Sequence, residues 1–380
     1  MSDVQPDPWF EVSEIRARVS RIQAKLAEDR QDALLAFFPE SVTWSTGFFT
    51  RGYSSFQFAI IPVDGDPVIV CRDVEAYYLD LTAVFPGRML WTDSDDKNKV
   101  AIDAIASVVG QRARLAVEMV AWPLSVGRFE ALKAGLPNVE WTDGSGIISG
   151  MRLIKSPAEI DYQRRAARAA EAGMEAGMVA AVAGATEREM AAQICAAMIR
   201  AGSDRPGPGV LSSGERALHL HGGYTDRVLE HGDIVQLETT PHVRHYHARF
   251  MRPIRVAEAT DEDHQVVEKL IRIQDDALAE VRPGVAATVP DKIYRQGALD
   301  AGLMREYTNK TFYSIGLLME PSGGEPLEAH PVATWTFEPG MTFHTYILAR
   351  GFGMSETIVV TPDGYERLTT FPRKLLVSAQ

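Results

Sequence analysis

A hairpin signal in the middle of the chain constrains the fold more than any other feature. Gly232-Asp233 is a turn dipeptide, and residues 234–240 then alternate apolar and polar side chains, as in a strand with one apolar face. Residues 243–252 are expected to form a second strand. That strand would place three polar side chains on one face: His245, His247 and Arg249. The hairpin therefore gathers acidic, imidazole and guanidinium groups on one sheet face, where an active site can form.

Three further motifs follow this hairpin. Residues 313–317 read YSIGL, residues 339–343 read PGMTF, and residues 355–361 read SETIVVT. Together with TDRVLEHGDIVQLE at residues 225–238, they resemble the creatinase, aminopeptidase P and methionine aminopeptidase superfamily, whose catalytic domain has the pita-bread fold. The resemblance runs along the chain in order and is detailed from about residue 150 onward.

The resemblance also locates the positions at which most members of the superfamily bind two metal ions, through two Asp, one His and two Glu. This chain has Glu238, Arg249, Tyr313 and Tyr346 at four of these positions. Glu356 matches the fifth only if an offset of one residue is allowed. An arginine at a ligand position repels a divalent cation, and a phenol replaces an imidazole or a carboxylate. We therefore expect no metal site and no other cofactor.

The fold class that the resemblance implies is α+β, with a pita-bread catalytic domain at residues 153–380. A smaller α/β domain of the creatinase type is expected at residues 1–152, where strands alternate with helices. The helix pattern at residues 13–29 belongs to this first domain. In the second domain, Ser156-Pro157 followed by Glu159 is a capping box that predicts the start of a long helix, which ends near residue 182.

Composition excludes several classes of partner. The chain has 380 residues and a formal charge of −12, and this acidity opposes binding to nucleic acid or to anionic membranes. The first residues show no secretory signal pattern, and no run approaches the roughly 18 apolar residues of a membrane span. Cys71 and Cys195 lie far apart and are expected to be free thiols. We expect a cytoplasmic enzyme with a small-molecule substrate.

Two branches of the superfamily work without metal. Creatinase hydrolyses a C–N bond of a guanidino compound, and ectoine hydrolase opens a cyclic amidine. This chain is more similar to ectoine hydrolase, through Leu-Glu at 237–238, Arg-x-Tyr-His-Ala at 244–248 and Met-Thr-Phe-His at 341–344. The resemblance implies a metal-independent hydrolase that cleaves a C–N bond of a small zwitterionic compound, with an ectoine-type cyclic amidine favoured.

Three residues are candidates for the chemistry. His221 matches the position of the proton-transferring histidine of the superfamily, and an imidazole can donate a proton to a leaving nitrogen near neutral pH. His219 competes with it for this role. Glu238 is expected to act as general base or as nucleophile, although it can also be a structural partner of Arg249. Glu356 is the alternative base.

Five further residues are candidates for substrate binding. His247 and His344 lie on strands expected to face the cleft, and the Tyr313 phenol can donate a hydrogen bond to a substrate carboxylate or carbonyl. Arg51 and Tyr53 lie in an aromatic, glycine-broken loop. In creatinase-like members the matching loop closes the active site of the partner subunit, so the resemblance implies a homodimer. An aromatic ring there suits a cationic amidine or guanidinium.

Other functions remain open on the sequence. A creatinase-type guanidino compound is the nearest alternative substrate. A metal-dependent Xaa-Pro peptidase would need ligands that this chain has replaced. A non-catalytic relative that only binds a partner is the third alternative, and the polar groups kept at 219–221 and at 238 argue against it.

Overall fold

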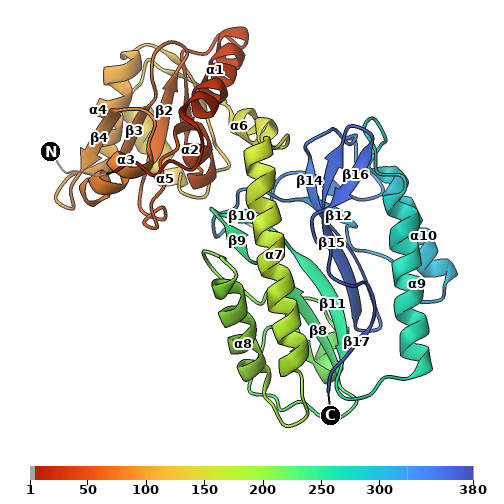
Figure 1. Cartoon of the computed structure of the whole chain (residues 1–380). Coiled ribbons are helices and arrows are strands. Elements are labelled where there is room, and N and C mark those ends of the chain that lie inside the picture. The colour runs from red at the N-terminus through yellow and green to blue at the C-terminus, as the bar shows by residue number, and fades with distance from the viewer. Residues whose placement is uncertain (1–4, 323, 380) are drawn as a thin grey trace. The chain divides into compact units, whose positions relative to one another are not determined.

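The computed structural model describes residues 5–322 and 324–379. The chain divides after Arg152 into two compact units, residues 1–152 and residues 153–380, which we call the first and the second unit (Figure 1). Within the described residues, no helix is both long enough and apolar enough to cross a membrane.

The first unit is built on one six-stranded sheet with the strand order β4-β3-β2-β1-β5-β6. The strands are β1 (Ala33–Ala36), β2 (Phe58–Pro62), β3 (Val68–Arg72), β4 (Gly87–Trp91), β5 (Arg114–Val117) and β6 (Glu140–Asp143). The helices are α1 (Val12–Glu28), α2 (Pro39–Thr46), α3 (Ala76–Thr82), α4 (Lys97–Val109), α5 (Val126–Gly135) and α6 (Ser145–Met151), with a 3-10 turn at Asp73–Glu75. Strand β2 is antiparallel to β1 and β3, and the other pairs are parallel.

Apolar periodicity explains how these elements pack. Ile15, Val19, Ile22 and Leu26 recur at helical spacing on α1 and are all buried, and α1 contacts β1 and β2. Strand β1 is buried at every position, as expected for a strand in the middle of a sheet covered by helices. This unit supplies an α/β layer structure of the kind predicted for the N-terminal part of the chain.

The described part of the second unit combines four helices with sheets that are antiparallel except for the parallel pair β11–β17. The helices are α7 (Pro157–Ala180), α8 (Glu187–Arg200), α9 (Asp261–Leu278) and α10 (Thr288–Asp300), and a 3-10 turn spans Gly214–Leu218. One sheet has the order β17-β11-β8-β7, from β7 (Leu211–Ser213), β8 (Ile234–Thr239), β11 (Phe250–Arg255) and β17 (Leu376–Val377). The other has the order β13-β12-β14-β15-β16, from β12 (Phe312–Ser314), β13 (Glu328–Ala329), β14 (Thr342–Ala349), β15 (Phe352–Thr361) and β16 (Gly364–Arg367).

The helices cover these sheets in two pairs. Figure 1 shows α7 beside the strands β8 and β11 with α8 packed on α7, and α9 beside β14 and β15 with α10 packed on α9. Close packing of α7 on the sheet depends on small residues, since a Cβ at Gly177 would lie 2.5 Å from the Leu237 Cδ2 atom. The inner strands β11 and β15 contact each other, so the two sheets meet along the middle of the unit.

Helix α7 begins where the sequence predicts. The Ser156 hydroxyl accepts a hydrogen bond from the Glu159 backbone N–H at 3.3 Å, and the Glu159 carboxylate accepts one from the Ser156 N–H at 2.8 Å. Pro157 occupies the first turn, where its missing N–H has no cost. The helix ends at Ala180, two residues before the predicted end.

The second strand of the central hairpin differs from its prediction. Residues 243–252 do not form one strand, because the chain turns at Arg244 and His245, whose φ angles are 51° and 62°. The short strands β9 (His242–Val243) and β10 (Tyr246–His247) flank this turn, and the pairing with β8 is resumed only by β11. Contacts from outside the hairpin hold the turn: the Arg244 N–H donates to Asp204, and the Leu318 N–H donates to the His245 carbonyl.

Candidate active site

A cavity of about 780 Å³ lies in the second unit, lined by residues from both sheets. Its polar lining includes His221, Glu238, Arg249, Tyr313, His344 and Tyr346. Four of these are the residues at the superfamily's metal-ligand positions. The sequence motifs therefore converge in space on one cavity, with Glu238 on β8, Arg249 just before β11, Tyr313 on β12 and Tyr346 on β14.

Glu238 and Arg249 form an ion pair inside this cavity. Arg249 Nε lies 3.2 Å from Glu238 Oε1, and Arg249 Nη2 lies 3.3 Å from Glu238 Oε2, so the two planar groups meet edge to edge. Burial lowers the pKa of Arg249, but the charge and hydrogen bonds of Glu238, together with the Tyr313 side chain, outweigh burial and raise that pKa above its ordinary range. Arg249 is thus a permanent cation at a position where the superfamily has a metal ligand.

The imidazole of His344 links two hydroxyl groups. Its Nδ1 lies 2.8 Å from Tyr313 Oη, and its Nε2 lies 2.7 Å from Ser355 Oγ. Burial, helped by the charge of Arg249, lowers the pKa of His344 well below its usual value, so the ring is neutral. When the Tyr313 hydroxyl donates to Nδ1, the ring proton is on Nε2. Nε2 also lies 3.7 Å from Glu238 Oε1.

The two tyrosines are neutral at physiological pH. Burial, with a contribution from the charge of Glu238, raises the pKa of Tyr346 to about 12. Burial likewise raises the pKa of Tyr313 above its ordinary range. The Tyr346 ring stacks on His344, with ring centroids 5.4 Å apart and an interplanar angle of 13°. Both phenols are hydrogen-bond donors within the cavity lining rather than anionic metal ligands.

The register of β15 decides which residue takes the fifth position. Ser355 is paired directly with Tyr346 across β14 and β15, so their side chains share a sheet face. Glu356 is one residue further and therefore points to the opposite face. The residue that completes the cluster is Ser355, which the sequence motif missed, and the alternation rule is the signal that would have identified it.

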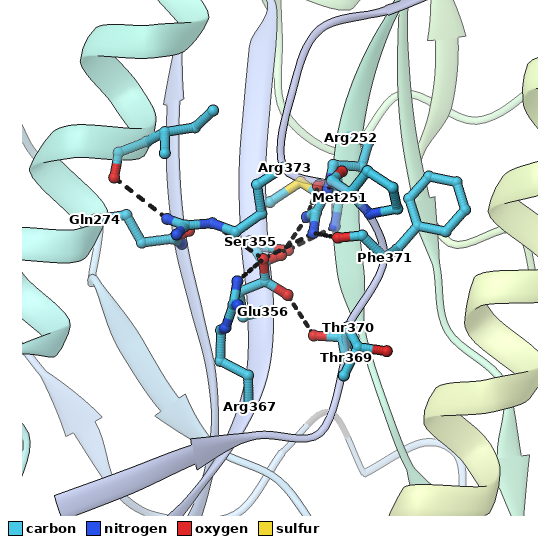
Figure 2. A network of polar contacts seen from close by, with 12 residues as sticks. Met251, Arg252, Gln274, Ser355, Glu356, Arg367, Thr369, Thr370, Phe371 and Arg373 are labelled. Carbon is cyan, nitrogen blue, oxygen red and sulfur yellow. Dashed lines mark hydrogen bonds and ion pairs between the residues drawn. The ribbon is translucent and has the colours of Figure 1, made fainter.

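Glu356 lies in a separate buried network, shown in Figure 2. Its Oε1 is 2.8 Å from Arg252 Nη2 and 3.5 Å from Arg373 Nε, and its Oε2 accepts a hydrogen bond from Thr369. Arg252 also donates to the backbone carbonyls of residues 371 and 372. These contacts attach the C-terminal segment to β11 and β15, and Glu356 is not among the residues that line the cavity.

The residues of the cluster do not fit a divalent metal pair. Two tyrosines with raised pKa values, a serine and an arginine stand beside one carboxylate, Glu238, and one imidazole, His344, whose two nitrogens already face the Tyr313 and Ser355 hydroxyls. Mg²⁺ and Mn²⁺ need several oxygen donors, and Zn²⁺ needs several carboxylate, imidazole or thiolate donors. Across residues 5–322 and 324–379, no group of three or more His, Cys, Asp or Glu side chains is arranged to hold a metal ion.

His221 and His219 are separated by their positions. His221 lines the cavity, within a segment that also places Leu220, Gly222 and Gly223 there. His221 has a φ of 63°, an uncommon backbone conformation for a residue other than glycine. Both histidines are exposed, and His219 is not part of the cavity lining.

The remaining predicted residues are more dispersed. His247 lies in the β9–β10 hairpin, where its ring packs against His242, and it is not part of the cavity lining. Burial, with the charges of Arg249 and His245, lowers the pKa of His247 to about 3. Arg51 and Tyr53 lie in the first unit, in the turn between α2 and β2. Their role in covering a substrate stays a prediction.

The structure adds polar groups that no motif indicated. Lys310 and Glu328 both line the cavity and form an ion pair, and Asn309 lies beside them. Glu325 also lines it and pairs with the buried Lys155, which is 170 residues away in the chain. These residues lie on irregular segments or at strand ends, where sequence patterns carry little information.

Comparison with known proteins agrees with the geometry. The model of a creatinase/prolidase N-terminal domain matches residues 18–154, and that of metallopeptidase family M24 matches residues 161–362. The ectoine hydrolase of Halomonas elongata is 24% identical over 97% of this chain and 98% of its own length. A probable dipeptidase PepE of Mycobacterium bovis is 26% identical over 96% of this chain and 97% of its own length.

Among solved structures, the dipeptidase PepE of Mycobacterium ulcerans has a TM-score of 0.84 and 23% identity, and the match covers 98% of this chain and 100% of that one. This likeness confirms the predicted α+β pita-bread fold with a creatinase-type N-terminal domain. The predicted superfamily is confirmed as well. The chain belongs to metallopeptidase family M24 and is a hydrolase of that family.

Proposed function

We propose that this chain is a metal-independent hydrolase that cleaves a C–N bond of a small zwitterionic compound, with an ectoine-type cyclic amidine as the favoured substrate. The observation that carries the proposal is the Glu238–Arg249 ion pair at two metal-ligand positions of an M24 fold. With Tyr313 and Tyr346 at two others, the cavity provides a carboxylate, a cation and phenol donors instead of a metal pair.

The chemistry follows from the roles these groups can take. Hydrolysis of an amidine adds one water molecule, breaks one C–N bond and yields an amide and an amine. Glu238 removes a proton from the attacking water, or attacks the amidine carbon itself before water releases the product. His221 delivers a proton to the departing nitrogen, which leaves as an amine. Either route leaves Glu238 and His221 in their starting protonation states after proton exchange with solvent.

The remaining lining residues orient the substrate. A zwitterionic amidine carries one carboxylate, for which Arg249, Lys310 and the tyrosine hydroxyls are suitable partners. Its cationic ring suits the carboxylates of the lining. Arg51 and Tyr53 are proposed to cover the cavity of a second copy of the chain in a homodimer, as the superfamily resemblance implies.

A dipeptidase is the second candidate, since full-length relatives include a probable dipeptidase. Peptide hydrolysis in a metallopeptidase relies on metal-bound water, for which the cluster offers a poor donor set. A guanidino compound of the creatinase type remains a third substrate for the same residues. These candidates differ in metal requirement and in substrate, so one experiment separates them.

The test uses the full-length protein purified without chelator. Ectoine, creatine and an Xaa-Pro dipeptide are each offered as substrate, with and without prior EDTA dialysis. We expect ectoine turnover that EDTA leaves unchanged, and less than one equivalent of transition metal by elemental analysis. At 100 times its dissociation constant, ectoine should also stabilise the fold by about 2.7 kcal/mol, which raises the melting temperature. Metal-dependent dipeptide cleavage without ectoine turnover would refute the proposal.

A further inference from the structure

A buried carboxylate outside the cavity contacts both ends of the loop that carries His221, alongside the pairing of Ser213 with Val235 and the Arg188 N–H bond to the Thr225 carbonyl. Glu187 is the first residue of α8, and its side chain is fully buried. Its Oε1 accepts hydrogen bonds from the Ser213 N–H at 2.8 Å and the Ser213 hydroxyl at 2.7 Å. Its Oε2 accepts from the Thr225 N–H and the Thr225 hydroxyl, both at 2.7 Å. Each oxygen therefore holds one end of the segment 213–225.

Arg216 joins the two ends through the same carboxylate. Its Nη1 lies 2.9 Å from Glu187 Oε1 and 2.7 Å from Oε2, and its Nη2 donates to the Gly223 carbonyl at 2.5 Å. Burial raises the pKa of Glu187, but the hydrogen bonds from Ser213, Thr225 and Arg216 outweigh burial, and the net pKa is lowered. Glu187 is thus an anion, and both of its carboxylate oxygens accept hydrogen bonds from residues 213, 216 and 225 of this loop.

The middle of this loop reaches the cavity. Leu220, His221, Gly222 and Gly223 are consecutive lining residues. The Leu211 N–H donates to the Gly222 carbonyl at 3.0 Å. The Gln236 amide, with its nitrogen facing the loop, donates to the carbonyls of residues 217 and 219 at 3.0 and 3.1 Å. The geometry is that of an Ω-loop whose ends are closed by Glu187 and whose tip presents His221.

We propose that Glu187 is a positioning residue for His221, acting through Ser213, Arg216 and Thr225 and touching no substrate itself. This inference rests on the proposed function, in which His221 moves the proton. Closing the loop ends fixes the backbone on both sides of His221, including its unfavourable positive φ, which a free loop would relax. Through Glu187, helix α8 therefore fixes the position of the loop backbone that carries the His221 imidazole, although the two are distant in sequence.

The substitution Glu187→Gln tests this directly. A glutamine has only one side-chain oxygen, and its amide nitrogen cannot accept a hydrogen bond, so one end of the loop loses its anchor. Glu189→Gln is the matched control, because Glu189 lies on the same helix, is exposed, and its side chain accepts only from Gln193 among the contacts of the described chain. Thr225→Val is a milder variant if Glu187→Gln does not fold. It removes the hydroxyl bond to Glu187 and the bonds that this hydroxyl accepts from Arg216 Nη1 and the Arg227 N–H, and it keeps the other three bonds from the loop ends to Glu187.

The first measurement needs no substrate. The NMR signal of His221 in histidine-labelled protein is identified by its disappearance in His221→Ala, among nine histidines. We expect Glu187→Gln to shift or broaden this signal, Thr225→Val to do so less, and Glu189→Gln to leave it unchanged. An unchanged His221 signal in both Glu187→Gln and Thr225→Val would overturn the inference, whatever the substrate is.

The second measurement is turnover of ectoine. A histidine misplaced by about 1 Å can cost on the order of 10²-fold in rate, so Glu187→Gln should lower kcat by roughly 10- to 100-fold with little change in KM. Adding Glu187→Gln to His221→Ala should cost less than about twofold more, because the two changes remove one effect. Full additivity would contradict a role through His221. Failure of the unmodified protein to hydrolyse ectoine ends the substrate proposal, and the NMR comparison still decides the role of Glu187.

Discussion

At the scale of single residues, the site is organised by local charge balance. Glu238 faces Arg249, Glu328 faces Lys310, and Glu325 faces Lys155. A buried charge without a partner costs several kcal/mol, so the pairs Glu238–Arg249 and Glu325–Lys155 make these charges tolerable in the protein interior. Lys310 and Glu328 are 37% and 45% exposed, so their pair contributes little to stability. A substrate with one positive and one negative group can exchange partners with such pairs without leaving a net buried charge.

Glu238→Gln separates chemistry from packing. If Glu238 is the base or nucleophile, ectoine turnover should fall by at least about 10²-fold while ectoine still raises the melting temperature. Loss of the partner of Arg249 should also cost about 1–3 kcal/mol of unfolding free energy, less than for a fully buried pair because a quarter of the Arg249 side chain is exposed. Activity assays and denaturant unfolding measure the two effects separately.

Two further variants complete this comparison. Glu238→Gln with Arg249→Met should recover stability but not turnover, and recovered turnover would end the catalytic candidacy of Glu238. Glu356→Gln is the matched control, since Glu356 pairs with the fully buried Arg252 outside the cavity. It should cost about 3–5 kcal/mol in stability while the folded protein keeps its kcat.

The sequence predicts some of these residues and not others, for physical reasons. The pairing of Glu238 with Arg249 follows from neighbouring strands of one hairpin, so a local pattern reveals it. Ser355 escapes a motif search that tolerates a one-residue offset, because in a strand such an offset moves the side chain to the other face. The pair Lys155–Glu325 joins distant segments and has no local signature.

At the scale of elements, helix α7 shows how a local signal sets a boundary. Ser156→Ala removes the hydroxyl that caps the Glu159 N–H, and it should lower the unfolding free energy by about 1 kcal/mol. Glu159 also accepts a hydrogen bond from the buried Tyr246 hydroxyl at 2.6 Å, so a displaced Glu159 would loosen β10 as well. Thermal unfolding measures the change, and Ser156→Thr, which keeps the hydroxyl, should stay within about 0.5 kcal/mol. Equal losses in both variants would show that the cap is not the cause.

The β9–β10 turn shows where local signals fail. Arg244 and His245 have positive φ angles, although neither position holds a glycine or asparagine, the residues that usually indicate such a turn. The conformation is held by two hydrogen bonds: the Arg244 N–H donates to Asp204, and the Leu318 N–H donates to the His245 carbonyl. Both partners are far from the turn in sequence. Tertiary contacts overrode the strand propensity of residues 243–252, and propensity alone therefore predicted an unbroken strand.

At the scale of the whole molecule, stability should depend on one buried acid in the first unit. Glu118 is fully buried and accepts hydrogen bonds from the backbone N–H groups of residues 37 and 38, both at 2.8 Å, and from the Ser41 hydroxyl at 2.5 Å. Burial raises its pKa to about 7, although these hydrogen bonds and the charge of Arg152 lower it in part. The folded protein thus keeps a proton on Glu118 that the unfolded chain releases near pH 4.3.

The sign of the pH effect follows. Stability from this group is fully present below the unfolded pKa and is lost as pH rises through the folded pKa of about 7. Between pH 5 and pH 8 the loss should be about 2–3 kcal/mol. In Glu118→Gln the side-chain oxygen can still accept from residues 37 and 38, and the Ser41 hydroxyl can turn to accept from the amide. Denaturant unfolding at both pH values should show a smaller pH dependence in this variant, and an equal dependence would contradict the assignment.

The fold as a whole was predictable because its motifs occur along the chain in the order of the superfamily and on strands that meet in one cavity. The alternation of strands and helices likewise predicted the layers of the first unit. The cavity-lining residues outside these motifs were not predictable in the same way. Asn309, Lys310 and Glu328 enter the lining through tertiary placement of short connecting segments.

The Glu238–Arg249 pair also has an evolutionary consequence. Changing Arg249 alone to Asp would set two carboxylates against each other while Tyr313 and Tyr346 still offer no imidazole or acid to recruit an ion. Restoring either tyrosine position first would leave the guanidinium in place to repel the ion. Each single substitution toward a two-metal ligand set is therefore unfavourable until the other positions have changed as well. On the proposed metal-independent function, we expect a gain of metal binding to require several of these substitutions together.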